Sequence, residues 1–180
     1  MPVRSEGRGA PPAAPPPRFW RQPSARYRNF QIAYTLLALN FVIPAFSYSF
    51  LPDVAVAQFL SVQERLGGAP YLGVEGASHL WRYLGAANVM TLGFTCLLLQ
   101  FDLRRYHAAL VPLTFMKLYA ATSWLVGWAV EPGYRFFLAF AVLDYVTSAA
   151  FVYFARGAHR DIATLADDQL VPRPGWGVLR

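Results

Sequence analysis

The sequence predicts an all-α fold, an integral membrane antiparallel four-helix bundle with both termini cytoplasmic. Hydrophobic residues make up 56% of the chain and charged residues 14%, whereas a soluble domain has about 25% charged residues. The apolar residues form four blocks of about 21–23 residues, which as helices of about 32–35 Å match a hydrocarbon core of about 30 Å. Spans in lipid are helical because every backbone N–H and C=O needs an internal partner. The predicted spans are residues 29–51, 79–101, 108–130 and 135–155.

The two ends of the chain are predicted to be basic cytoplasmic tails. Residues 1–28 are rich in proline and arginine and show no apolar periodicity, so we expect a flexible segment there and a second tail at residues 156–180. Of the fifteen arginines, six lie in the first tail, four in the second and two in the link between the second and third spans. This leaves three for the other face, so the positive-inside rule puts both termini in the cytoplasm.

A cleaved signal peptide is the competing interpretation of the first span. Ala55-Val56-Ala57 resembles a small-residue cleavage site. A proline-rich leader of 28 residues and an apolar region of 23 residues are both long for such a signal. If cleavage occurred, three spans would remain and the mature N-terminus would lie outside.

Residues 52–78 form the one sizeable predicted loop between spans, on the outer face. Residues 53–66 have an apolar helical face, Asp53 is a suitable N-cap, and Gly67-Gly68-Ala69-Pro70 ends the pattern. We therefore expect a short amphipathic helix on the outer surface. It either caps the bundle or covers a substrate site.

The only lysine, Lys117, lies inside the third predicted span, and Asp144 is the only carboxylate deep inside one. At 1.5 Å per residue, Lys117 and Asp144 lie roughly 15 and 16 Å from the cytoplasmic end of their spans, and Asn40 and Asn88 roughly 16 and 19 Å. These four residues are predicted to form a polar layer at mid-membrane. Lipid offers such groups no partner, so they should face the bundle interior.

The polar layer allows three interpretations. Lys117 and Asp144 can be a neutralised pair that fixes helix register, with the two asparagines completing its hydrogen bonds. They can instead be a proton or substrate site, since a buried lysine can release its proton whereas arginine stays charged. A Schiff base at Lys117 is the third, in a pocket of Trp124, Tyr119 and Tyr145 with Asp144 as counter-ion.

A second group of polar residues is predicted at the outer face. It consists of Glu75, His79, Arg82 and Glu131. Interfacial anchoring and a local Arg82–Glu131 pair account for these residues. The mouth of a ligand site is the functional alternative.

Several site classes are not indicated. A single cysteine, Cys96, excludes an intramolecular disulfide and multi-cysteine metal motifs. The histidines His79, His107 and His159 lack metal-ligand spacing, so no metal and no cofactor are expected. Catalytic residues cannot be assigned, since no nucleotide-binding, zinc-protease, redox or nucleophile motif occurs. Topology explains the basic charge, so nucleic-acid binding is not expected either.

The layout of the chain resembles the small DoxX-like four-helix bacterial membrane proteins. The resemblance covers residues 29–155 and rests on the four spans, the long first loop and the block HLWRYLGAANVMTLGFTCLLLQFDLRRY. It implies a four-helix membrane fold and, for some members, an association with quinone-coupled oxidation complexes. A weaker resemblance is to the four-helix sterol-isomerase-type fold, which relies on buried acidic residues, and of these only Asp144 is present.

Three functional interpretations follow. The first is a non-enzymatic accessory subunit or lipid- or small-molecule-binding bundle in a bacterial inner membrane, as a homo-oligomer or in a larger complex. The second is a membrane enzyme or redox-associated protein that acts on a lipid or quinone, with Lys117 and Asp144 handling protons. The third is a proton-coupled carrier working as an oligomer. A cavity around the polar layer would favour the second, and a dry packed pair the first.

Overall fold

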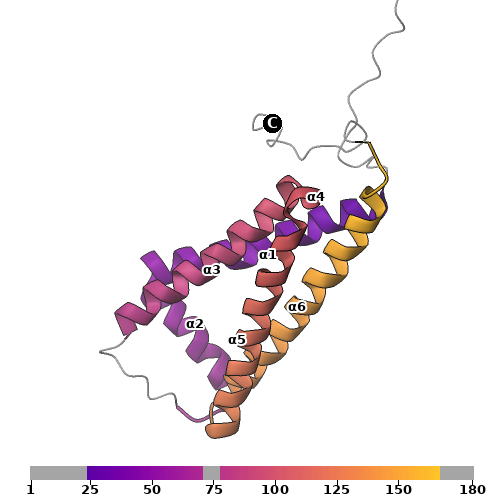
Figure 1. Cartoon of the computed structure of the whole chain (residues 1–180). Helices are drawn as coiled ribbons and strands as arrows, with labels where there is room; N and C mark the ends of the chain where they lie inside the picture. Colours follow the sequence, from indigo (N-terminus) through magenta and orange to yellow (C-terminus); the bar gives the residue numbers. More distant parts are fainter. Residues whose placement is uncertain (1–23, 71–77, 167–180) are drawn as a thin grey trace, which may run out of the picture.

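The computed structural model describes residues 24–70 and 78–166, which are helical apart from short turns and caps (Figure 1). The elements are α1 (Ala25–Phe50), α2 (Pro52–Arg65), α3 (Ser78–Phe101), α4 (Leu103–Tyr106), the 3-10 helix η3 (His107–Ala109), α5 (Leu110–Val130) and α6 (Arg135–Ile162). Four stretches are long and apolar enough to cross a membrane: Ala25–Phe50, Tyr83–Phe101, Leu103–Val130 and Arg135–Ile162. The prediction of a helical chain with four candidate spans is therefore confirmed for the described residues.

The long helices form two pairs. α1 packs against α3, α5 packs against α6, and the pairs meet through α1 and α6, whereas α3 and α5 scarcely touch. The pairs lie close together near α4 and diverge toward α2, which runs between them (Figure 1). We call these regions the α4 end and the α2 end. The four long helices therefore do not surround a closed centre, because one of the four possible neighbour contacts is nearly missing.

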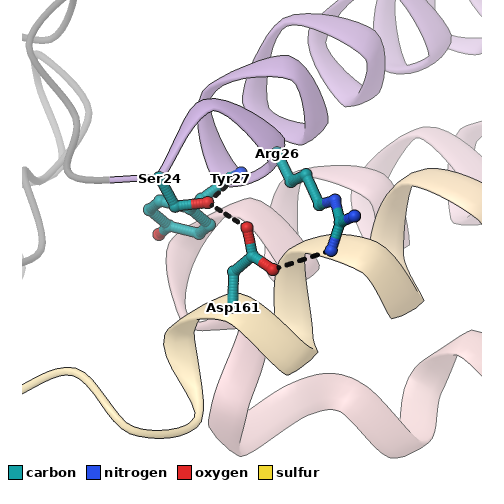
Figure 2. A network of polar contacts seen from close by, with 4 residues as sticks. All are labelled: Ser24, Arg26, Tyr27 and Asp161. Carbon is teal, nitrogen blue, oxygen red and sulfur yellow. Dashed lines mark hydrogen bonds and ion pairs between the residues drawn. The ribbon is translucent and has the colours of Figure 1, made fainter.

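The first long helix begins earlier than predicted because its first residues are anchored to the last helix. The Ser24 hydroxyl caps α1 by accepting from Tyr27 N at 3.1 Å, and it donates to Asp161 Oδ2 at 2.7 Å (Figure 2). Arg26 Nη1 donates to the other carboxylate oxygen of Asp161 at 3.1 Å. An N-cap of this kind satisfies an amide that would otherwise lack a partner.

These contacts correct both predicted tail boundaries. α1 starts at Ala25 rather than at residue 29, and α6 continues to Ile162 rather than ending at residue 155. The last residues of the predicted first tail and the first residues of the second are thus ordered helix. The remainder of both tails, residues 1–23 and 167–180, lies outside the described residues.

Aromatic side chains fill the interface of α1 with α6. Phe30, Tyr34 and Phe151 are buried, and the Tyr34 hydroxyl donates to the Phe151 carbonyl at 3.0 Å. Between α1 and α3 the helices approach closely at Gly93, where an added Cβ would lie 2.8 Å from Val42 Cγ2. The interface between α1 and α3 therefore depends on the lack of a side chain at Gly93.

The short helix α2 begins at Pro52, one residue before the predicted start at Asp53. Leu51 is the N-cap and makes no side-chain capping bond, so Asp53 lies in the first turn rather than at the cap. Proline is favoured at the first helical position because its missing N–H would have no helical partner there. Gly67 follows the helix with a φ of 63°, a conformation that glycine adopts without strain.

Candidate functional site

A cavity of about 630 Å³, the central cavity, lies between the two helix pairs. α1, α3, α5 and α6 contribute to its wall, and α2 contributes at the α2 end. All four residues of the predicted polar layer line it: Asn40, Asn88, Lys117 and Asp144. The four residues that residue counting places at a similar depth therefore share one location in the structure.

Lys117 and Asp144 form an ion pair between α5 and α6. Their side chains are only 12% and 9% exposed, so both charges are largely removed from solvent. The ammonium also lies over the ring of Phe41 on α1, with Nζ 5.2 Å from the ring centroid. The face of an aromatic ring attracts a cation, so Phe41 adds a second stabilising contact to the lysine.

The two amides of the polar layer do not complete the ion pair. Within the described residues, neither Asn40 nor Asn88 is hydrogen-bonded to Lys117 or Asp144, and both amides are exposed. The prediction that they satisfy the pair is not met in this geometry. They leave amide donors and acceptors on the wall of the central cavity.

Aromatic rings line the central cavity at the α2 end. Phe59 of α2 lies between Tyr48 of α1 and Phe140 of α6, with ring centroids 5.9 and 5.0 Å away. Trp124 of α5 is 5.8 Å from the Phe140 ring. The wall therefore combines a polar region at the ion pair with aromatic faces nearer α2, an arrangement suited to a ligand that is itself partly polar and partly apolar.

Gln63 fixes α2 in this position, and sequence reasoning missed it. This buried residue donates through Nε2 to the carbonyls of Ala69 and Gly133, at 2.7 and 2.9 Å. Its Oε1 accepts from Phe136 N at 3.1 Å, at the start of α6. One side chain thus joins the end of α2 to the turn between α5 and α6. The feature of the sequence that could have indicated this role is a glutamine within the apolar pattern of residues 53–66.

The weak contact between α3 and α5 leaves one side of the central cavity unsealed in the described part of the chain. On the opposite side, α1 and α6 pack together. Asn88 of α3 and Tyr119 of α5 line the cavity and are both exposed. If the long helices cross a bilayer, this side faces the acyl chains.

The remaining residues singled out in the sequence do not all line the central cavity. Trp124 and Tyr119 line the central cavity, whereas Tyr145 is hydrogen-bonded to Thr122 at 3.2 Å on an exposed surface. The rings of His107 and His159 stack at 3.9 Å. The part of the chain that the structure describes contains no group of three or more metal-ligating side chains.

The predicted outer-face cluster lies mostly outside the described residues. Glu75 is not described, and of His79 and Arg82 only the helical backbone in α3 is. Glu131 is exposed and forms the C-cap of α5. The Arg82–Glu131 pair therefore stays a prediction.

Comparison with models of known families, with curated proteins and with solved structures finds no match to this chain.

Proposed function

We propose that this chain is a multi-pass membrane protein that binds an amphiphilic small molecule, a lipid or a quinone, in the central cavity. The observation that carries the proposal is that the Lys117–Asp144 pair, although largely removed from solvent, lies on the wall of that cavity. A volume of about 630 Å³ falls within the range of small-molecule sites, about 300–1,000 Å³.

The wall offers complementary chemistry to such a ligand. An ammonium has three N–H donors, so Lys117 can donate to a ligand oxygen while it remains paired with Asp144. The amides of Asn40 and Asn88 add further donors from the facing helices. A quinone or an ester headgroup provides carbonyl acceptors for these groups. An attached hydrocarbon tail would leave between α3 and α5.

A second candidate is proton transfer with the bound molecule, in which the chain belongs to a membrane enzyme or redox system. It is favoured by the placement of a lysine and an aspartate together beside the ligand space. A positioned acid–base group acts within hydrogen-bond reach of the proton it transfers. Binding and proton transfer share one site, so binding is tested first.

We also infer a bacterial plasma membrane as the location, with both termini in the cytoplasm. The concentration of arginines in the two tails and the link between α3 and α5 supports the cytoplasmic orientation of the termini. Accessibility of single introduced cysteines to a membrane-impermeant reagent, in a Cys96→Ala background, would test the orientation in whole cells.

Fluorescence titration tests binding in the central cavity. The purified protein in detergent is titrated with a short-chain benzoquinone and with a short-chain phospholipid while tryptophan emission is followed, because Trp124 lies on the cavity wall. Ala120→Phe places a ring in the cavity, and Ala129→Phe adds the same ring at an exposed position of α5. We expect saturable quenching that Ala120→Phe abolishes and Ala129→Phe preserves.

Two outcomes would contradict the binding proposal: no saturable response to either probe, or an equal response from Ala120→Phe and the unchanged protein. Proton exchange is measured in the same titration with a pH-sensitive dye in weak buffer. Proton uptake or release on binding, lost in Asp144→Asn, would favour the second candidate.

A further inference from the structure

A second cavity of about 320 Å³ lies at the opposite end of the molecule, between the start of α1 and the last turns of α6. It shares no residue with the central cavity. Its polar lining comes from both helices: Arg26 and Asn29 from α1, and Tyr153, Arg156 and Arg160 from α6. Three arginines therefore line one small cavity.

The charge around the second cavity is not balanced by the residues described. Arg26 is paired with Asp161 at 3.1 Å, and that carboxylate also accepts from the Ser24 hydroxyl (Figure 2). Neither Arg156 nor Arg160 forms an ion pair with a carboxylate of residues 24–70 or 78–166. Three arginines and one aspartate give a formal charge of 3 − 1 = +2.

The length of α6 allows the second cavity to lie beyond the hydrocarbon core. α6 has 28 residues, or about 42 Å, against about 30 Å for the apolar part of a bilayer. Arg156 and Arg160 belong to its last two turns, one turn apart on the same face. Tyr153, one turn closer to the middle, is 75% exposed, as tyrosines at a membrane interface are.

We propose that the second cavity binds a phosphate group, supplied either by the headgroup of an anionic lipid or by a soluble phosphate compound. Guanidinium groups bind phosphate oxygens through paired N–H donors, and basic pockets between membrane helices are known sites for anionic headgroups. The fixed Asp161 contact holds Arg26 at the edge of the cavity. The two arginines of α6 supply the uncompensated charge. This site is independent of the ligand proposed for the central cavity.

The test uses the full chain in detergent and measures the midpoint of thermal unfolding and the apparent affinity from titration. Three additives are compared at equal concentration: phosphatidylglycerol, phosphatidylcholine and inorganic phosphate. The double variant Arg156→Gln/Arg160→Gln removes the unpaired charge. Arg105→Gln is the matched control, since Arg105 is exposed at the same end and does not line the cavity.

We expect phosphatidylglycerol to stabilise the protein more than phosphatidylcholine does. Each arginine close to an anionic headgroup contributes roughly a fivefold factor in affinity, so the affinity of the double variant should fall about 25-fold while that of Arg105→Gln changes little. A comparable effect of inorganic phosphate would identify a soluble phosphate as the source. Equal responses to all three additives, or an affinity unchanged in the double variant, would overturn the proposal.

Discussion

The buried ion pair makes the sharpest stability prediction. Lys117→Met leaves Asp144 as an uncompensated carboxylate with a side chain 9% exposed. Removal of one partner of a buried pair costs about 3–5 kcal/mol, while replacement of both by apolar residues is often nearly neutral. Asp144→Leu should cost about 0.5–2 kcal/mol less than Lys117→Met, because the orphaned ammonium keeps its contact with the Phe41 ring.

The assay is thermal unfolding in detergent of both single variants and of the double variant Lys117→Met/Asp144→Leu. For a chain of this size about 1 kcal/mol shifts the midpoint by about 2–4 °C, so Lys117→Met should lower the midpoint by about 6–20 °C and Asp144→Leu should lower it by less. Leu118→Met and Val146→Leu are controls at exposed positions one or two residues away, with 41% and 61% exposure.

Recovery of the double variant to within about 1 kcal/mol of the unchanged protein is the expected result. Single variants that lose less than about 1 kcal/mol would refute the reasoning, because the charges would then be solvated rather than mutually compensated. A double variant that stays as unstable as the worse single variant would also refute it, since the pair would then contribute through packing and not through charge.

Three further changes test the contacts that hold the helices together. Gln63→Leu should destabilise the fold by about 2–3 kcal/mol through the loss of three hydrogen bonds, whereas the exposed neighbour Glu64→Gln should unfold at the same denaturant concentration as the original chain. Gly93→Ala should cost about 1–3 kcal/mol of stability by overpacking. Gly85→Ala, with nothing within 4 Å of the added methyl, should be neutral or stabilising. Equal unfolding midpoints for the two variants would show that α1 and α3 can move apart to accept the methyl group. Ser24→Ala should cost about 1 kcal/mol and increase hydrogen exchange in the first turn of α1; unchanged exchange there would argue against the cap.

The long helices and the shared location of the four polar side chains could be predicted from the sequence because both depend on local quantities. Span length follows from uninterrupted apolar residues, and depth follows from counting residues along a helix. Asn40, Asn88, Lys117 and Asp144 line one cavity for that reason. Helix ends were predicted less well: the start of α1 depends on Asp161, which is 137 residues away from Ser24 in the chain.

The arrangement of the helices required information that residue counting does not contain. A polar residue in each span is compatible with a closed bundle and equally with two diverging pairs. Gln63 decides part of this outcome, yet its partners are backbone groups of Ala69, Gly133 and Phe136. Every residue but proline carries both a backbone donor and an acceptor, so sequence alone cannot identify which ones a glutamine will bind.

The location of both ion-pair partners in one helix pair has a consequence for biosynthesis. α5 and α6 follow one another in the chain, joined by a turn of residues 131–134. A single charged residue at the centre of an inserting helix costs about 2.5–3.5 kcal/mol at the translocon. If the two helices enter the membrane together as a hairpin, Lys117 and Asp144 can neutralise one another before any other helix is present. Insertion of this half of the chain would then not wait for α1 and α3.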